Sequence, residues 1–356
     1  MIRRQNGFSL IELIIAMAVS VITIAAASTV FIEIFRNFKQ QSRIAETNIE
    51  GLIGFELLRN DLQNAGYGLP WDVAGAAYGE VVGAPGQDYN DAPAAAPKAV
   101  VSGNDIITIG ANDSDYLIIK SVNVVQNPAS DLWTTLQTGN VRQPWTPATE
   151  NLAAGHRVIV LNVGTPTADR HALIVNGVNF FTTYGNTAAF DPVDSSTVHV
   201  IYGVDAATNL RAPFNRADYF IDTANVPPRC APNTGRLIKA AMSHANGSLA
   251  NQMVLWDCVA DLQVVYRLDT TVPPDGDVDN NTSDITGLDA AAIRTQLREV
   301  RVYILAQEGQ VDRRYTYPTG TVTVGEFLMG RDFDLTALGA NWQNYRWKVY
   351  TVGISL

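Results

Sequence analysis

A long apolar run close to the N-terminus constrains this 356-residue chain more than any other feature. Residues 13–32 are apolar apart from a few small hydroxyl side chains, and about 20 such residues are enough to cross the hydrocarbon core of a bilayer as a helix. Glu12 directly precedes the run. A carboxylate in a membrane helix costs about 2.5–3.5 kcal/mol on insertion scales, so Glu12 is expected to have a function that requires it. The hydroxyl side chains in the run are those of Ser20, Thr23, Ser28 and Thr29.

The residues before the run form a second pattern. Arg3 and Arg4 make a short basic leader. Gly7 is followed by Phe8, and Glu12 is the fifth residue counted from Phe8. This arrangement resembles the prepilin signal of type IV pilins and of type II secretion pseudopilins. In that family a prepilin peptidase cuts after the glycine, and the new N-terminal residue is methylated. The resemblance therefore implies cleavage after Gly7 and N-methylation of Phe8.

Two other interpretations compete with a prepilin signal. A cleaved secretory signal would need a small-x-small cleavage site followed by a polar mature start, and the long apolar run does not supply one. An ordinary signal anchor would span the membrane equally well, but it would have no use for Glu12.

The chemistry of the motif suggests how Glu12 would act. Cleavage would free an α-amino group on Phe8, which is cationic at neutral pH. In a filament of packed helices, the Phe8 ammonium of one subunit could meet Glu12 of its neighbour. An apolar core tolerates a charge pair where it does not tolerate a lone charge, so the pair would fix the register between subunits.

The charge balance limits the partners of the chain. It has 25 basic and 35 acidic side chains and a formal net charge of −10. Such a surface repels phosphate backbones, so we do not expect nucleic-acid binding. The basic leader is expected on the cytoplasmic side, which places the bulk of the chain in the periplasm, outside the inner membrane.

Cys230 and Cys258 are the only cysteines. In an oxidising periplasm they are expected to form a disulfide, and two unpaired buried thiols are the alternative. Closing a loop of this size would stabilise the fold by roughly 3–4 kcal/mol in the chain-entropy model.

The helical pattern continues beyond the apolar run. Apolar or small side chains recur at steps of three and four residues, which predicts one helix over 8–66, transmembrane over 8–34 and amphipathic over 35–66. A coiled-coil dimer is the alternative for the second half, and Gly51 and Gly54 argue against it. The predicted buried stripe is Phe38, Ala45, Ile49, Leu52, Phe55, Leu58, Leu62 and Ala65. The predicted solvent side carries Lys39, Arg43, Glu46, Glu50 and Asp61.

The rest of the chain divides into a loop and a β-rich head. Residues 67–98 are rich in Ala, Gly and Pro, which predicts a long irregular loop, either exposed for subunit contacts or a passive linker. Residues 99–356 show strand patterns without strand–helix alternation, so we expect an α+β fold with a mainly antiparallel head and a short helix at 290–296. The predicted strands are 105–110, 116–125, 157–163, 172–184, 197–204, 218–222, 262–267, 299–306 and 345–354.

Three segments narrow the resemblance to the PilW type of minor pilin. They are Leu-x-x-Asp-Leu-x-x-Ala-Gly-Tyr at 58–67, Val-x-x-Leu-Gln-Val-x-Tyr-x-x-Asp at 259–269, and a last strand at 345–351. Residues 100–217 carry no such motif. The resemblance implies a priming or tip complex that starts pilus assembly, with other minor pilins, the major pilin and a tip adhesin as partners. The alternative within this fold class is the GspJ-like pseudopilin of type II secretion.

The sequence contains no recognisable catalytic motif. Its four histidines, at 156, 171, 199 and 244, show no HExxH or other metal-ligand spacing, and there is no GxSxG, GxxxxGK[ST] or GxGxxG segment. We therefore expect a protein that is not an enzyme, and a membrane-anchored periplasmic enzyme is the remote alternative.

An acidic segment is the only candidate for ion binding. Oxygen side chains at alternate positions suit a hard cation such as Ca²⁺. However, Asn280 stands where an EF-hand loop needs glycine, and Thr286 stands where it needs glutamate. The alternative is a solvated turn stabilised by its Asp and Asn side chains. The candidate ligands are Asp275, Asp277, Asp279 and Asn281.

Overall fold

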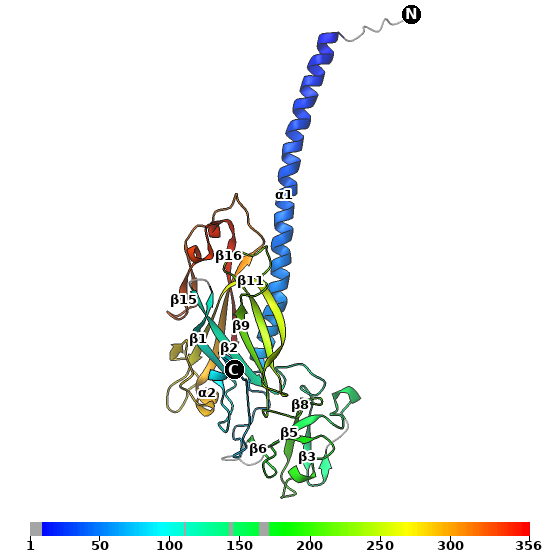
Figure 1. The fold of residues 1–356 in the computed structure, drawn as a ribbon, viewed down its shortest axis with the longest axis vertical. Helices are drawn as coiled ribbons and strands as arrows, with labels where there is room; N and C mark the ends of the chain where they lie inside the picture. The colour runs from blue at the N-terminus through cyan, green and yellow to red at the C-terminus, as the bar shows by residue number, and fades with distance from the viewer. Residues whose placement is uncertain (1–8, 110–111, 142–144, 164–170) are drawn as a thin grey trace, which may run out of the picture.

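The computed structural model describes residues 9–109, 112–141, 145–163 and 171–356. Gly7 and Phe8 lie outside the described residues. One long helix, α1 (Leu10–Gln63), projects from a β-rich head, and the N-terminus lies at the far end of this helix (Figure 1). The expected α+β fold, with a long apolar N-terminal helix and an antiparallel β-rich head, is confirmed.

Helix α1 begins and ends at local signals in the sequence. Ser9 is its N-cap, and no proline interrupts the chain before Pro70. The helix ends at Gln63, three residues before the expected boundary. Gly66 and Gly68 then adopt φ values of +85° and +68°, a backbone conformation that glycine adopts without strain.

The head is built on one large antiparallel sheet in the order β1-β2-β9-β10-β11-β13-β16, with β12 paired to β11. The second half of α1 packs against β11, β13 and β16, and its Leu58 and Leu62 are fully buried in the core of this layer. The strands are β1 (Val100–Ile109), β2 (Asn112–Ser121), β9 (Asn215–Asp222), β10 (Gly235–Met242), β11 (Leu249–Leu268), β12 (Asn280–Thr282), β13 (Leu297–Glu308) and β16 (Arg346–Ser355).

A smaller lobe lies at the end of the head farthest from the N-terminus (Figure 1). Its sheet has the order β4-β3-β8-β5-β6, with β7 beside β5, and it is inserted in the chain between β2 and β9. Its strands are β3 (Trp133–Gln137), β4 (Asn140–Val141), β5 (Arg157–Asn162), β6 (Ala172–Leu173), β7 (Thr182–Thr183) and β8 (His199–Asp205).

The remaining elements are short. Helix α2 (Ala290–Gln296) has the bounds that the sequence predicted. A two-stranded sheet joins β14 (Thr321–Val324) to β15 (Arg331–Asp334). The 3-10 helices are η1 (Gly86–Tyr89), η2 (Ala148–Glu150), η3 (Ala188–Phe190), η4 (Leu335–Leu338) and η5 (Trp342–Asn344).

Some strand predictions were wrong or missed. The predicted strand 172–184 is two strands of two residues, β6 and β7, because Asn176 and Asn179 exchange backbone hydrogen bonds and turn the chain between them. Strands β3, β4, β10, β12, β14 and β15 were not predicted from the sequence.

The disulfide between Cys230 and Cys258 is present, as expected. It joins the segment before β10 to the middle of β11, and both cysteines are buried.

The buried face of α1 differs from the predicted stripe. Leu58 and Leu62 are buried as predicted, but Ile49 and Leu52 are about 60% exposed, and the helix meets the head also through small residues. A side chain at Gly51 would overlap the ring of Trp256, and one at Gly54 would overlap the backbone carbonyl of Leu255. The glycines therefore permit close contact between helix and sheet. The buried residues of α1 are Thr47, Gly51, Gly54, Leu58, Asp61 and Leu62.

We expect Gly54→Ala to lower the melting temperature of the full-length protein in detergent. The new Cβ would press on the backbone of Leu255, and overpacking of this kind costs about 1–3 kcal/mol. The gain in helix propensity offsets at most about 1 kcal/mol. Gly287→Ala is the control, because no heavy atom lies within 4 Å of its added Cβ. Equal melting temperatures for wild type and Gly54→Ala would contradict the close-packing account.

Candidate functional site

The first turn of α1 carries a reciprocal capping box. The Ser9 backbone N–H donates to Glu12 Oε2 at 3.0 Å, and the Glu12 backbone N–H donates to Ser9 Oγ at 3.3 Å. These two bonds satisfy donors that a helix N-terminus otherwise leaves unpaired. The sequence analysis missed this role of Glu12, although the Ser-x-x-Glu spacing of residues 9–12 signals it.

The capping box leaves Glu12 free to bind a second donor. An ionised carboxylate offers about four lone-pair sites, and the Ser9 N–H uses one of them. Glu12 is also exposed, so a neighbouring subunit can reach it. The pairing of Glu12 with the Phe8 ammonium of another subunit stays a prediction, because Phe8 lies outside the described residues.

The first half of α1 is exposed, and an ion pair between Glu33 and Arg314 joins its end to the head. Every residue from 9 to 39 is exposed, and α1 contains the one candidate membrane span among the described residues, with a mean hydropathy of 2.5. The hydroxyl groups of Ser20, Thr23 and Thr29 donate to backbone carbonyls of their own helix at 2.7–2.8 Å. This segment therefore presents a long apolar surface with these polar groups already satisfied, as a lipid or a packed bundle of helices requires.

The second half of α1 is tied to the head by a buried charge. Asp61, expected on the solvent side, is 7% exposed and accepts bonds from Lys239 Nζ and the Tyr219 hydroxyl. Burial raises the pKa of Asp61 above its usual value, and the Lys239 ammonium opposes this shift. Because Lys239 and Tyr219 lie on β10 and β9, this contact fixes the end of α1 to the middle of the large sheet.

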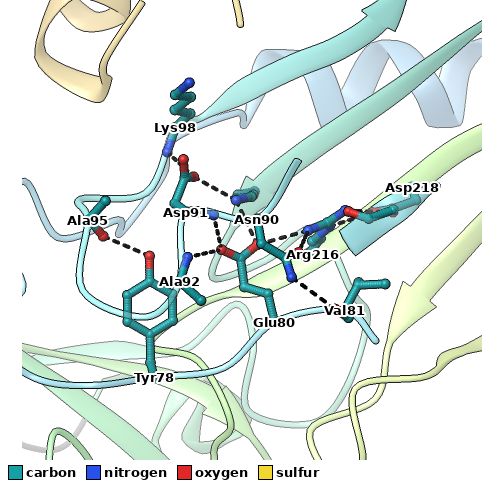
Figure 2. A network of polar contacts seen from close by, with 12 residues as sticks. Tyr78, Glu80, Val81, Asn90, Asp91, Ala92, Ala95, Lys98, Arg216 and Asp218 are labelled. Carbon is teal, nitrogen blue, oxygen red and sulfur yellow. Dashed lines mark hydrogen bonds and ion pairs between the residues drawn. The ribbon is translucent and has the colours of Figure 1, made fainter. Parts of the chain in front are cut away.

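The loop over residues 67–98 is anchored by a second buried charge cluster (Figure 2). Glu80 Oε2 lies 2.7 Å from Lys120 Nζ and 2.9 Å from Arg216 Nη1. Lys120 also pairs with Asp91 at 2.6 Å, and Arg216 pairs with Asp218 at 2.7 Å. The side chains of Glu80, Lys120, Arg216 and Asp218 are fully buried.

Hydrogen bonds complete this cluster. Glu80 Oε1 accepts the backbone N–H groups of Asp91 and Ala92 at 2.7 and 3.1 Å, and Arg216 Nη2 donates to the Gly86 carbonyl at 2.8 Å. Burial alone would raise the pKa of Glu80, but the Lys120 and Arg216 cations hold it below its usual value. The carboxylate is therefore ionised at neutral pH. Without solvent access it cannot meet a substrate, and its role is to hold the loop on β2 and β9.

The loop is thus neither a passive linker nor a generally exposed surface. Its apolar side chains join the core between the large sheet and the smaller lobe, where they pack with Ile159 and Leu161 of β5. One sequence signal for this anchoring was available, because Lys120 directly follows the apolar residues 116–119 of β2. The loop residues in this core are Leu69, Val73, Ala76, Tyr78 and Val81.

We expect Arg216→Met to destabilise the head by about 3–5 kcal/mol, because the carboxylates of Glu80 and Asp218 would lose a shared buried partner. Arg236→Met is a matched control on the neighbouring strand. Arg236 pairs with Asp222 at 2.7 Å, but both side chains are partly exposed, so its loss should cost about 0–1 kcal/mol. Thermal melts of the two full-length variants check this difference, and equal melting temperatures would show that the cluster does not anchor the loop.

The two buried histidines have structural partners. His199 Nδ1 lies 2.9 Å from the Phe190 carbonyl. His244 lies between the Arg211 backbone N–H and Asn215 Oδ1, each at 3.1 Å. Burial lowers the pKa of His244 to about 4, so it is neutral at physiological pH.

The proposed calcium ligands make local turn contacts. Asp275 Oδ1 accepts the Asp277 N–H at 3.0 Å, and Asp279 Oδ1 accepts the backbone and hydroxyl groups of Thr270 at 2.9 and 2.7 Å. Asn281 lies in β12. Among the residues that the structure describes, no group of three or more His, Cys, Asp or Glu side chains is placed to hold a metal ion. Calcium binding by this segment stays a prediction.

Comparison with known proteins bears on the N-terminal segment. Residues 2–28 match the model of the prokaryotic N-terminal methylation motif, the type IV pilin-like signal. No curated protein and no solved structure matches the chain. The match implies processing by prepilin peptidase and assembly with other pilins, and it indicates a structural rather than an enzymatic protein. The N-terminal motif and the apolar helix that carries most of it support a type IV pilin-like or pseudopilin protein.

Proposed function

We propose that the protein is a minor pilin of the PilW type, part of the priming or tip complex that initiates type IV pilus assembly. The observation that carries this proposal is the division of α1 (Leu10–Gln63). Its first half is wholly exposed and carries most of the methylation motif, whereas its second half is packed on a large head. A helix divided in this way can enter a bundle of similar helices while the head stays outside it.

The proposed work of the protein is non-covalent. Before assembly, the apolar half of α1 crosses the inner membrane and the head lies in the periplasm. In the complex, α1 packs among the helices of other minor pilins and the major pilin. The Glu12 carboxylate forms an ion pair with the Phe8 ammonium of the adjacent subunit. The smaller lobe lies at the end of the head opposite the N-terminus, so in a tip complex it faces outward, where a tip adhesin would bind (Figure 1).

The same helix would serve a type II secretion pseudopilus, so the partners must be identified directly. Affinity purification of the tagged protein from its native cells, followed by mass spectrometry, separates the two functions. Pilins and a large adhesin support the pilus assignment. Pseudopilins and secretion components would replace it with the pseudopilin function.

Processing gives the first test of the proposal. We expect the intact mass of the mature protein to show the loss of residues 1–7 and the addition of one methyl group, because Gly7 and Phe8 match the prepilin cleavage site. A strain without prepilin peptidase is the control and should retain the full chain. A mature protein that starts at Met1, or that is cut after the apolar run, would rule out a pilin.

Variants of the first turn separate the two roles of Glu12. Glu12→Gln removes the charge but keeps an acceptor for the Ser9 N–H, whereas Ser9→Ala removes one capping bond and keeps the carboxylate. We expect Glu12→Gln to lower the recovery of partner pilins several-fold and Ser9→Ala to leave it near the wild-type level.

The readouts for these variants are the pull-down of partner pilins, the count of surface filaments and the cleavage state of the leader. Equal assembly of Glu12→Gln and wild type would show that the charge is not the assembly determinant. An uncleaved leader in Glu12→Gln would mean that the prepilin peptidase, rather than a neighbouring subunit, recognises Glu12.

A further inference from the structure

A basic pocket of about 610 Å³ lies between α1 and the chain that precedes β16. Its α1 residues lie between Glu33 and Ile44, where the helix passes from its exposed half to the half that is packed on the head. Two acidic side chains, Glu33 and Asp312, also line it. The basic residues that line it are Arg36, Lys39, Arg43, Arg313, Arg314 and Arg346.

Most of this positive charge is not neutralised within the chain. Arg314 pairs with Glu33 at 2.8 Å, and Arg346 pairs with Asp312 at 3.0 Å. Within the described part of the chain, no acidic side chain forms an ion pair with the other four basic residues of the pocket. A protein with a net charge of −10 thus concentrates unneutralised cations at one place.

Two buried donors in this pocket also lack an acceptor among the described residues. They are Gln40 Nε2 and Arg346 Nη1. A buried donor without a partner loses about 1–3 kcal/mol of hydration, and a bound water or ion is one way to recover it. The other four basic side chains are exposed or half-buried, so an anionic oxygen entering the pocket can reach them and neutralise the surplus charge.

The position of the pocket along α1 indicates where this anion comes from. The apolar run ends at Ile32, and Arg36 follows one helical turn later, about 6 Å along the axis at 1.5 Å per residue. The headgroup layer of a bilayer extends about 5–8 Å beyond the hydrocarbon core. When α1 spans a membrane, the pocket therefore begins within the headgroup layer.

We propose that this pocket binds the phosphate of an anionic phospholipid and so holds the head against the membrane surface before assembly. The inference rests on the proposed membrane anchorage of α1. A lipid phosphate fits better than a nucleic acid, because the net negative charge of the chain repels a long polyanion. It fits better than an acidic protein surface, because the pocket is continuous with the apolar span that lipid already surrounds. Basic residues next to a membrane helix recognise anionic headgroups in this manner.

The test uses the full-length protein in detergent, titrated with dioleoyl phosphatidylglycerol or with neutral dioleoyl phosphatidylcholine. Native mass spectrometry counts the lipids bound. Lys39→Gln combined with Arg313→Gln weakens the pocket. Arg59→Gln combined with Lys98→Gln removes the same charge from elsewhere on the protein and is the matched control. Circular dichroism and an intact disulfide check that all variants are folded.

We expect wild type and the control to bind phosphatidylglycerol in preference to phosphatidylcholine. We expect the pocket variant to bind phosphatidylglycerol roughly 20-fold more weakly, since each basic residue near an anionic surface contributes on the order of a five-fold change in affinity. Equal binding of the two lipids by the wild type, or equal binding by the pocket variant and the control, would overturn the proposal.

Two further measurements show whether a soluble anion or an acidic protein, rather than a lipid, occupies the pocket. If millimolar inorganic phosphate displaces phosphatidylglycerol, the pocket is a site for a soluble anion and the lipid proposal is wrong. If the pocket variant keeps its lipid but loses co-purifying pilins, the occupant is an acidic protein surface. None of these measurements depends on leader cleavage or on filament formation. A negative result would therefore reject lipid binding without rejecting the minor pilin assignment.

Discussion

The fold of the head depends on burying opposite charges together. Glu80 and Asp91 from the connecting loop meet Lys120 on β2 and Arg216 on β9, and none of these side chains has appreciable contact with water. Ions in such a place are stable only when each has a partner, so the loop can close only when both strands are already paired. The cluster therefore couples the folding of the loop to that of the large sheet and of the base of the smaller lobe.

The contact between Asp61 and Lys239 has a corresponding effect on the helix. Helix α1 is a 54-residue element whose residues up to 39 are all exposed. Its second half is fixed by the close approach of Gly51 to Trp256 and by the buried Asp61. A rigid attachment of this kind transmits the position of the head to the apolar half of the helix, which is the part that neighbouring subunits would contact.

Local patterns predicted the elements whose causes are local. The apolar run, the short helix α2 and the antiparallel strands follow from periodicity and turn residues, and the disulfide follows from the compartment and the presence of two cysteines. The predicted buried face of α1 was right at Leu58 and Leu62 and wrong nearer the middle of the helix, because hydrophobic periodicity cannot recognise a contact made by glycine. The burial of Asp61 and Glu80 was missed because their partners are distant in sequence, with Lys239 and Arg216 lying 178 and 136 residues away. The basic pocket was missed for the same reason, since it combines α1 residues between Glu33 and Ile44 with residues 311–314, which follow β13, and with Arg346.

The smaller lobe has one topological property with a wider consequence. It leaves the large sheet after Ser121 and returns at Asn215, and these two residues face each other in the antiparallel pairing of β2 with β9. Because the ends of the insertion are already held side by side, a change in its length alters the entropy of chain closure only slowly. The lobe can therefore be enlarged, shortened or exchanged during evolution while the sheet and the helix stay the same. The same helix and large sheet can in this way carry outer lobes of different size and shape.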